Sequence, residues 1–577
     1  MKTKKLINGA DDVIPEMIEG MIGAHPDILA LDGESGRAVV ALNGPREGKV
    51  GIVLGGGSGH EPAFSGYVGK GLADAVAVGN VFASPSPGQI CDAALAADGG
   101  AGVVFLYGNY TGDVMNFDMA SEELAAQDIP AISVLVTDDV ASAPPERAAE
   151  RRGIAGGFFV FKCAGAAADL GYDLDAVVRL ANHANAMTRS SGVALGACSL
   201  PQTCRANFEI GPDEMEIGMG IHGEPGIART RLQSADAVAD RLLDLILADM
   251  PLAEGDKVAV LVNGLGATPL MELYILHRRL GNRLKNMGVD IHHSWVGNYV
   301  TALEMAGASF SLLKLDEELT ALLDHPCHTP ALKVGKVDAP PPERRQTRRR
   351  RPAETGREVT RKTLVREGEI TPEIFRKMLL EAAAAISENK DRLCELDGAI
   401  GDGDHGVAMD TGWRAVREEL DSLDDSSTIT MICDRASKAF LNAVGASVGP
   451  LYATGFKRAG QAVDDRLNLD KASLVRWLKA MAQGIEERGG ACIGDKTMLD
   501  AWAPAALAAE RGETVLESLS AACDAAKQGM QATRGMKAAK GRSAKLGERA
   551  VGHVDPGAAS AWLIIKAMKD AAESALG

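Results

Sequence analysis

The feature that most constrains the fold is a change of sequence character at residues 338–368. This segment has three consecutive prolines and the four consecutive arginines Arg348, Arg349, Arg350 and Arg351, and it contains almost no large apolar side chain. Such a stretch cannot bury enough apolar surface to fold alone, so we interpret it as a linker. The arginines could also form a site for RNA or another anionic partner, but a solvated connection between two acidic bodies fits them better.

Before the linker, the sequence has the pattern of an α/β protein. Short apolar runs rich in valine and isoleucine end in glycine and are followed by helical segments. Such runs are typical of buried strands in parallel sheets, which carry functional loops at their carboxyl ends. We therefore expect two α/β subdomains, over residues 1–185 and 186–337. The predicted strands lie at 50–57, 101–109, 129–139 and 257–268.

After the linker, the strand pattern disappears, and residues 369–577 are predicted to form an all-α domain. Thr371 is a plausible N-cap, and Pro372 suits the first helical position of a helix that continues to residue 397. Other segments rich in alanine and leucine predict further helices, with glycine-rich loops between them. These helices are expected at 428–447, 473–489, 498–511, 515–533 and 557–576.

Charge and cysteine content exclude several classes of protein. The net charge is −17, which argues against a nucleic-acid-binding protein. The nine cysteines form no CxxC pair and are expected to be reduced thiols of a cytoplasmic protein. No apolar stretch is long enough to predict a membrane-spanning helix, and the basic start of the chain is not followed by the apolar core of a secretory signal.

The sharpest local motif is LDGAIGDGDHG at 396–406, which places Asp397, Asp402 and Asp404 within eight residues. Three carboxylates in one glycine-bent loop repel one another unless a cation neutralises them. The EF-hand pattern does not fit, so the loop is predicted to hold Mg²⁺ with positions left for substrate phosphates. His405 could donate to a phosphate or brace the loop. The alternative is a simple turn with exposed acids.

Glycine-rich segments further along the all-α domain are candidates for binding phosphates. Glycines that bare backbone N–H groups at a helix N-terminus form a cradle for anions. Basic residues near a Mg²⁺–triphosphate suit phosphoryl transfer, although the chain has no GxxxxGK[ST] motif and is not a P-loop enzyme. The candidates for nucleotide binding are His405, Gly445, Ser447, Gly449, Thr454, Lys496, Arg542, Asp555 and Gly557.

Three segments of the N-terminal half present polar residues on glycine turns. GGGSGHEP at 55–62 follows a predicted strand and presents His60, but it lacks the register of a dinucleotide fingerprint, so a small polar ligand is expected. GNYTGDVMNF at 108–117 presents Asp113 as a candidate acid or base. GMGIHGEPG at 218–226 holds His222 between glycines. Sequence alone does not bring these three sites together, and each could be a purely structural turn.

Taken together, these segments resemble the dihydroxyacetone kinase family. GGGSGHEP, NYTGD, GIHGEPG, DGDHG, GDKTMLDA and GHVDPGA occur in the family's order over nearly the whole chain except the linker. The order is that of the single-chain, ATP-dependent branch. The resemblance implies an α/β ketose-binding part in two subdomains, followed by an all-α helical barrel that binds ATP and Mg²⁺. It also implies a homodimer.

The resemblance further implies roles for individual residues. His222 matches the histidine that captures the substrate ketone in a covalent hemiaminal, which would separate a ketose from glycerol. Asp113 matches the acid/base residue that deprotonates the attacking hydroxyl, and His60 matches the catalytic histidine beside it. Asp397, Asp402 and Asp404 match the Mg²⁺ ligands. Substrate contacts are expected from Gly57, Ser58, Gly59 and Gly108.

Two positions depart from the family pattern. Dihydroxyacetone-specific members usually have a lysine where this chain has Gly108, so the pocket is expected to accept a longer ketose such as the four-carbon erythrulose. Relatives usually have a serine where this chain has Val448, and Ser447 could substitute for it. The resemblance leaves two alternatives to a kinase, namely an FAD-AMP lyase that forms cyclic FMN and a ketose-binding regulatory protein.

Overall fold

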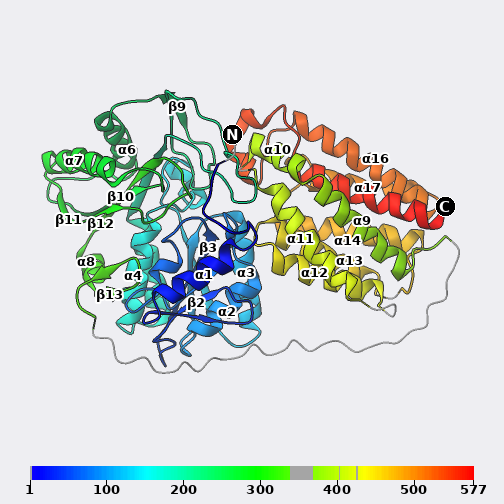
Figure 1. Ribbon diagram of the computed structural model, residues 1–577, viewed down its shortest axis with the longest axis horizontal. Helices are drawn as coiled ribbons and strands as arrows, with labels where there is room; N and C mark the ends of the chain where they lie inside the picture. Colours follow the sequence, from blue (N-terminus) through cyan, green and yellow to red (C-terminus); the bar gives the residue numbers. More distant parts are fainter. Residues whose placement is uncertain (1–2, 338–367, 402, 424–426, 465) are drawn as a thin grey trace. The chain divides into compact units, whose positions relative to one another are not determined.

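The chain divides into two compact units within the expected linker. The computed structural model describes residues 3–337 and 368–577, except 402, 424–426 and 465. The division lies between Arg351 and Pro352. The interpretation of 338–368 therefore falls, apart from Gly368, outside the described residues. Each unit is described separately below (Figure 1).

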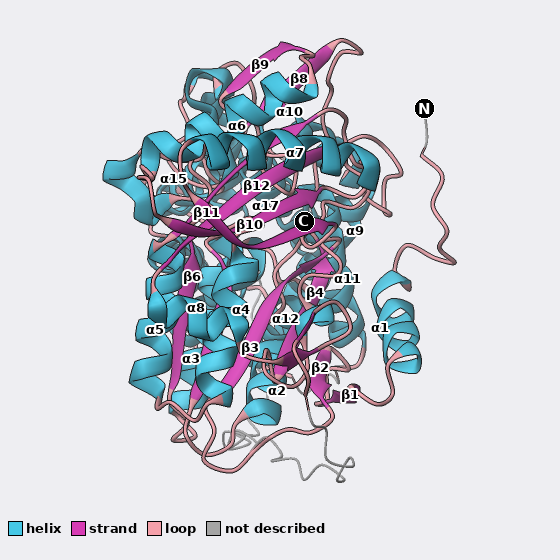
Figure 2. Cartoon of the chain, turned by 90° about the vertical axis from the view of Figure 1, so that its left-hand side faces the viewer, coloured by secondary structure: helices cyan, strands magenta, loops and turns pink. Residues whose placement is uncertain are grey.

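The first sheet of the N-terminal unit has the strand order β1-β2-β4-β3-β5-β6 (Figure 2). Strands β4, β3, β5 and β6 are parallel, and β1 and β2 extend this sheet by antiparallel pairing. The three strands predicted in this part of the chain are confirmed as β3, β5 and β6. The strands are β1 Leu29–Asp32, β2 Ala38–Ala41, β3 Gly51–Ser58, β4 Ala75–Val81, β5 Val103–Gly108 and β6 Ala131–Val136.

Helices cover both faces of this sheet. Val53 and Phe105 point to the face covered by α2 and α3, whereas Ile52 and Leu106 point to the face covered by α4 and α5. This alternation explains why the strands are apolar throughout, since a parallel sheet is buried on both sides. A further helix, α1, lies beside β1. The helices are α1 Val13–Ala24, α2 Pro87–Ala97, α3 Thr111–Ala125, α4 Gly157–Asp169 and α5 Leu174–Ala186.

The second sheet has the order β11-β10-β12-β7-β8-β9, and α6 and α7 cover one of its faces. The strand predicted at 257–268 is confirmed as β10, but the parallel pattern expected from it does not extend to the rest of this sheet. Only β10 and β11 pair in parallel, and all the other pairings are antiparallel. The central β12 is as buried as a parallel strand, because α6 and α7 cover one of its faces and the core shared with the first sheet covers the other. The strands are β7 Thr188–Ala194, β8 Glu214–Ile217, β9 Ala228–Arg231, β10 Lys257–Gly264, β11 Asp290–Gly297 and β12 Gly307–Leu315.

The two sheets share one apolar core. Leu54 and Leu106 of the first sheet and Leu261 and Leu313 of the second belong to the same buried cluster, together with most of α4. This shared core joins the two α/β subdomains into one unit, and the border expected at 185/186 stays a prediction. The remaining elements of this unit are α6 Ala235–Asp249, α7 Leu270–Asn286, α8 Glu317–Asp324, β13 Cys327–His328 and β14 Lys333–Val334.

The C-terminal unit is a barrel of antiparallel helices around one apolar core. In the described residues, helices α9 and α11 to α17 each pack against the next along the chain, α9 packing on α11, and α17 returns to α9 to close the ring. Helix α10 packs on α11 and α17. The helices are α9 Pro372–Glu388, α10 Lys390–Ile400, α11 His405–Asp421, α12 Ile429–Ala443, α13 Val448–Ala462, α14 Lys471–Gly489, α15 Leu499–Ala508, α16 Val515–Ala532 and α17 Pro556–Leu576.

The local predictions for this unit are mostly confirmed. The Thr371 hydroxyl accepts a hydrogen bond from the N–H of Ile374, so it caps α9 as expected. The prediction of a single helix that reaches residue 397 is wrong, because the chain leaves helical geometry at Asn389 and a separate helix, α10, follows. The helix expected to reach 447 ends at Ala443, where Val444 is extended. Among the described residues, none of the helices is both long and apolar enough to cross a membrane.

Candidate active site

His60 stands at the carboxyl end of β3, in the buried centre of the N-terminal unit. Gly59, with φ of +97°, turns the chain so that the imidazole stacks on Phe82 at 5.1 Å between ring centres. Its Nδ1 lies 2.7 Å from the carbonyl oxygen of Thr301, which can only accept, so Nδ1 carries the hydrogen. Burial, aided by the nearby His222, lowers the pKa of His60 to about 3. His60 is therefore neutral at physiological pH, with the lone pair of its Nε2 directed toward His222.

His222 faces His60 from the loop between β8 and β9. Its Nε2 lies 3.1 Å from Nε2 of His60, and its Nδ1 lies 2.9 Å from a carboxylate oxygen of Glu224. The second oxygen of Glu224 accepts the backbone N–H of His222. Since both Nδ1 atoms donate outward, a hydrogen bond between the two Nε2 atoms requires one additional proton. The histidine pair is thus built to exchange a proton with whatever enters between the rings.

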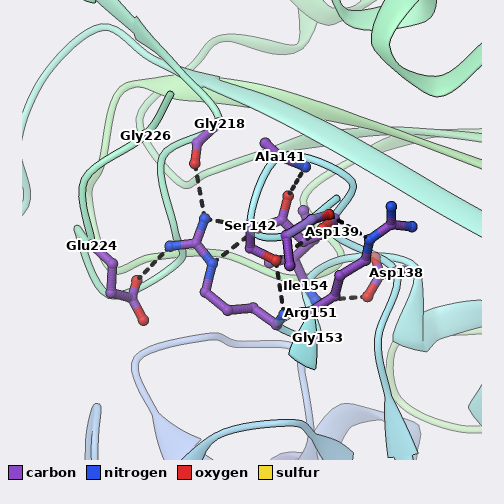
Figure 3. Close-up of polar contacts among 12 residues, drawn as sticks. Asp138, Asp139, Ala141, Ser142, Arg151, Gly153, Ile154, Gly218, Glu224 and Gly226 are labelled. Atoms are coloured by element: carbon purple, nitrogen blue, oxygen red, sulfur yellow. Dashed lines mark hydrogen bonds and ion pairs between the residues drawn. The ribbon is translucent and has the colours of Figure 1, made fainter. Parts of the chain in front are cut away.

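Glu224 is in turn placed beside a buried guanidinium. The side chain of Arg152 donates to Asp139 at 2.8 and 2.9 Å and to the carbonyl of Gly218 at 2.9 Å, and it lies 4.0 Å from Glu224. Figure 3 shows Glu224, Gly218 and Asp139 in this network. Burial alone would lower the pKa of Arg152, but the two carboxylates raise it above its ordinary value. A permanent positive charge therefore lies 4.0 Å from Glu224, behind His222.

Asp113 joins the two histidines in one pocket. It lies in the first turn of α3, directly after β5, and is buried. The space of the pocket that no protein atom occupies is about 440 Å³, including open solvent at its mouth. Glycines 55 to 57 line one wall, where a Cβ on Gly56 would lie 2.2 Å from the ring of Phe64. The lining residues are Gly55, Gly56, Gly57, His60, Phe64, Gly108, Tyr110, Asp113, Val136, Gly153, Ile154, Gly157, Phe161, Ile221, His222 and Val300.

Of the expected substrate contacts, Gly57 and Gly108 line this pocket, and Ser58 and Gly59 do not. The Ser58 hydroxyl donates to the carbonyl of Gly79, and the N–H of Gly59 donates to the carboxylate of Glu61. Gly108 lies against the ring of Tyr110, which a Cβ at position 108 would approach to 2.9 Å. The ring of Tyr110 packs edge-on against the ring of His222, with 4.8 Å between the ring centres.

The aspartate loop of the C-terminal unit folds between α10 and α11. One oxygen of Asp397 accepts the backbone N–H groups of Asp404 and His405, at 3.0 and 3.2 Å. His405 opens α11, and its Nε2 lies 2.9 Å from the hydroxyl of Ser560 on α17. Asp402 lies outside the described residues. The loop therefore brings Asp397, Asp404 and His405 together, next to the start of α17.

Asp555 lies close to this loop as the N-cap of α17. Its carboxylate accepts the N–H of Ala558 at 2.7 Å, and burial, with a contribution from the charge of Asp397, raises its pKa to about 7. Gly557 follows, and a Cβ there would lie 3.3 Å from the backbone nitrogen of Met498. The ammonium of Lys496 is buried and donates to the carbonyls of Thr533 and His553. Lys496 therefore ties the 494–498 loop to the segment before α17.

The other nucleotide candidates lie on neighbouring elements. Ser447 precedes α13, and a Cβ on Gly449 would meet the carbonyl oxygen of Val444 at 1.9 Å, so only glycine fits that helix start. Thr454 donates to the carbonyl of Pro450 within α13. Gly445 lies in the short connection between α12 and α13. Arg542 begins a 3₁₀ segment, Arg542–Ala550, that packs against α10; its side chain is not among those described.

Chain direction places these loops at one end of the barrel. Because consecutive barrel helices alternate in direction, the N-termini of α11, α13, α15 and α17 lie at the same end. The contacts of His405 with Ser560, and of Lys496 with Thr533, agree with this arrangement. Helix N-termini carry partial positive charge and exposed N–H groups, which attract anions. This end of the barrel therefore combines carboxylates with an environment favourable to phosphate.

Comparison with known proteins identifies the family. The model of the Dak1 domain matches residues 19–331, and that of the DAK2 domain matches residues 399–570. The chain belongs to the dihydroxyacetone kinase family. The Dak1 match spans both sheets of the N-terminal unit, and the DAK2 match covers most of the helical barrel. The expected architecture of an α/β part followed by a helical domain is thereby confirmed.

Relatives of similar length show that the whole chain is a kinase of this family. The D-erythrulose kinase of Mycolicibacterium smegmatis is 38% identical, over 98% of this chain and 98% of its own. The L-erythrulose 1-kinase of the same organism is 36% identical, over 98% of both chains. The dihydroxyacetone kinase from C. freundii, solved in complex with AMP-PNP and Mg²⁺, is 29% identical with a TM-score of 0.54, covering 98% of this chain and 99% of its own.

Sequence reasoning missed three residues of the pocket and its support. Glu224 lies two residues after His222 within the GIHGEPG motif, a spacing that could have indicated a partner for the imidazole. Tyr110 lies within the NYTGD motif. No local sequence pattern indicates a role for Arg152, because its partners Asp139 and Glu224 come from two segments that are far apart in the chain.

Proposed function

We propose that this kinase transfers the γ-phosphoryl group of ATP to a terminal hydroxyl of a short ketose held on His222. The observation that carries the proposal is the meeting of His60, Asp113 and His222, from three separate segments, in one pocket. Two histidines and a carboxylate around a small enclosed space are suited to bind a carbonyl and to move protons.

Capture of the ketone follows from the orientation of His222. With Nδ1–H directed at Glu224, the lone pair of Nε2 is available to attack a carbonyl carbon. The new N–C bond forms as the C=O π bond breaks. The carbonyl oxygen becomes a hydroxyl, and the proton that it gains is balanced by the one that Nδ1 of His222 passes to Glu224, so the hemiaminal forms without a net change of charge. Glycerol has no carbonyl and cannot form this bond, so the site selects ketoses.

Asp113 is proposed as the base for the phosphoryl acceptor. Its carboxylate stands at the start of α3 and lines the same pocket as His222. It would accept the proton of the terminal hydroxyl as the new O–P bond forms and the bond to the leaving ADP breaks. The helix N-terminus favours the ionised carboxylate that this role needs.

The loop at 396–406 fits Mg²⁺ by its donor chemistry. Asp397 and Asp404 supply hard carboxylate oxygens at the barrel end where four helix N-termini meet, and Asp402 would complete the set. Bound there, Mg²⁺ would neutralise the phosphates of ATP. The starts of α13 and α17, at Ser447 and Gly557, are proposed to donate backbone N–H groups to the phosphates. Gly449 donates its own N–H to the carbonyl of Ala446 and is proposed to shape the start of α13.

The acceptor is proposed to be a four-carbon ketose. Gly108 removes the cation and the bulk that dihydroxyacetone-specific relatives place at this position, and it leaves the pocket wall to glycine and the ring of Tyr110. Two of the similar full-length relatives are a D-erythrulose kinase and an L-erythrulose 1-kinase, which supports the chain length of the ketose without deciding its handedness.

The test is coupled ADP release by the purified full-length protein with ATP and Mg²⁺. Dihydroxyacetone, D-erythrulose, L-erythrulose and glycerol are compared with a blank that contains no sugar. We expect turnover with ketoses, none with glycerol, and the highest kcat/KM with one erythrulose enantiomer. A dihydroxyacetone preference would overturn the chain-length proposal, and glycerol turnover would overturn carbonyl capture.

Two variants test the ketose site and the nucleotide site separately. His222→Gln should abolish ketose-dependent ADP release while nucleotide binding to the barrel stays unchanged. Asp397→Asn should weaken binding of Mg²⁺–ATP while ketose binding stays unchanged. If His222→Gln keeps its activity, the proposed covalent capture is wrong.

A further inference from the structure

Two adjacent histidines of the N-terminal unit converge on one carboxylate outside the ketose pocket. His292 and His293 lie on β11, an edge strand of the second sheet, and Asp324 is the last residue of α8. Nε2 of His292 is 2.8 and 3.1 Å from the two carboxylate oxygens, and Nε2 of His293 is 3.0 Å from one of them. None of the three residues lines the pocket of His222.

A β-bulge makes this convergence possible. Successive side chains of a regular strand point to opposite faces, so two neighbouring histidines would normally diverge. Here the pairing of β11 with β10 steps from Ile291 opposite Val258 to His293 opposite Ala259, which leaves His292 as the extra residue. The two imidazole rings end 4.6 Å apart, edge to face. The backbone irregularity thus directs both rings to the end of α8.

The three side chains have the chemistry of a transition-metal site. One ligand atom from each lies within 4.8 Å of the other two. Tetrahedral ligands with bonds of about 2.0–2.1 Å lie roughly 3.3 Å apart. The contacts of 2.8 to 3.1 Å with Asp324 would therefore lengthen slightly, and the two imidazole nitrogens, which lie within 4.8 Å of each other, would draw together by rotation of the partly exposed rings. Imidazole nitrogens suit Zn²⁺, Ni²⁺ and Cu²⁺, whereas Mg²⁺ prefers oxygen ligands alone. The partial exposure of all three residues leaves a side open to water ligands.

We propose that His292, His293 and Asp324 bind one divalent transition-metal ion, with Zn²⁺ as the expected ion. The ion would join the edge strand β11 to the end of α8, two elements that otherwise meet here through histidine–aspartate contacts. It would also neutralise the charge of Asp324. The site needs neither the ketose nor the nucleotide, so the proposal stands apart from the proposed function.

Trp295 provides a local reporter for this site. Its ring lies 5.1 Å from that of His293, and the other four tryptophans of the chain, Trp413, Trp477, Trp502 and Trp562, all belong to the C-terminal unit. A paramagnetic ion such as Co²⁺ or Cu²⁺ quenches the fluorescence of a neighbouring indole. Binding at the proposed site should therefore quench one tryptophan selectively, and Zn²⁺ should reverse the quenching by displacement.

The experiment uses full-length protein that is first stripped of metal and then placed in excess Mg²⁺. The Mg²⁺ occupies the sites that are made of carboxylates alone. Titration with Co²⁺ should quench part of the fluorescence at one equivalent, and Trp295→Phe should bind the ion without that quenching. The double variant with His292→Ala and His293→Ala should no longer bind this one equivalent of Co²⁺. His277→Ala is the matched control, because His277 lies nearby on α7 but faces Ser294.

Equilibrium dialysis against Zn²⁺ decides the proposal. We expect one Zn²⁺ more per chain in the wild type than in the double variant, and at least a tenfold weaker affinity in Asp324→Asn, which keeps the side-chain volume. Equal Zn²⁺ content in all three proteins would overturn the proposal. Ketose-dependent activity should be the same in these variants, so a failure here is distinguishable from a failure of the proposed function.

Discussion

At the scale of single residues, the two imidazoles of the pocket face each other through their Nε2 atoms. His60 donates from Nδ1 to Thr301, and His222 donates from Nδ1 to Glu224, so both Nε2 atoms turn toward the same space. A carboxylate next to an imidazole selects its tautomer and stabilises the positive charge that forms during reaction. Glu224 is therefore a positioning residue whose effect passes through His222.

Replacing Glu224 with glutamine tests this role. The amide can donate to Nδ1 and so favour the wrong tautomer, and it cannot take up a proton. We expect kcat/KM for the ketose to fall roughly 100-fold while KM for ATP is unchanged. Glu224→Asp should recover part of the loss. Glu209→Gln, at an exposed position of the same unit, is the control and should keep full activity. An unchanged kcat/KM in Glu224→Gln would contradict the role.

Position 108 tests substrate choice at the same scale. Gly108→Lys should lower the ratio of erythrulose to dihydroxyacetone turnover about tenfold, because the side chain fills the space for the fourth carbon. Any side chain at 108 also presses on Tyr110, where the Cβ would be 2.9 Å from the ring. Gly108→Ala measures that effect separately. If the two variants change the ratio equally, the ring contact and not the lysine decides the preference.

At the scale of elements, helix starts determine where anions and metals can be held. Four helices of the barrel begin at the end that carries the aspartate loop. The residue that caps the N-terminus of α17 has a shifted pKa. Asp555 caps α17, yet burial and the charge of Asp397 raise its pKa to about 7. By contrast, Asp470 caps α14 with a pKa below its ordinary value, chiefly through its hydrogen bond with Ser473.

The two caps should respond differently to loss of charge. In metal-free and nucleotide-free protein at pH 8, Asp555→Asn should keep or raise the free energy of unfolding of the barrel, because asparagine caps a helix as well as aspartate and removes a buried charge. Asp555→Ala should lower it by about 1 kcal/mol. Asp470→Asn should lower it slightly. Thermal unfolding measures all three, and a large loss in Asp555→Asn would contradict the raised pKa.

At the scale of the whole molecule, the buried His60 links stability to pH. Its pKa is about 3 in the folded protein, whereas a histidine of the unfolded chain has a pKa near 6.5. Between these values the unfolded chain binds the proton and the folded one does not. Stability therefore falls as pH falls through this window.

The size of this effect can be measured. From pH 7 to pH 5, the contribution of His60 should cost about 2 kcal/mol of unfolding free energy. Denaturant unfolding at the two pH values, compared between the wild type and His60→Gln, isolates this contribution, since the variant lacks the titrating group. An identical pH dependence in both proteins would show that His60 is not neutral in the folded state.

The homodimer expected from the family resemblance also belongs to this scale and stays a prediction. One chain has a mass of 60.4 kDa. Sedimentation equilibrium should give twice this mass at micromolar concentration, and a constant single-chain mass over the concentration range would contradict the expectation.

The amino-acid sequence by itself determined the order of an α/β part and an all-α part, and the family to which the chain belongs. Short, continuous apolar runs rich in valine and isoleucine predicted β3, β5 and β6, and Thr371 with Pro372 predicted the start of α9, because these signals depend on residues close together in the chain. The mostly antiparallel pairing of the second sheet was not predictable in the same way. A strand buried on both faces has the same composition whichever way its neighbours run.

Only the tertiary structure decided which motifs share a site. His60 and His222 are separated by 161 residues and yet their Nε2 atoms are 3.1 Å apart, because the loops of two sheets meet over one core. The same packing assembles Arg152, Asp139 and Glu224 behind His222, and it allows the bulge of β11 to face the end of α8. Such contacts depend on how sheets and helices pack together, and the local sequence pattern carries no record of that packing.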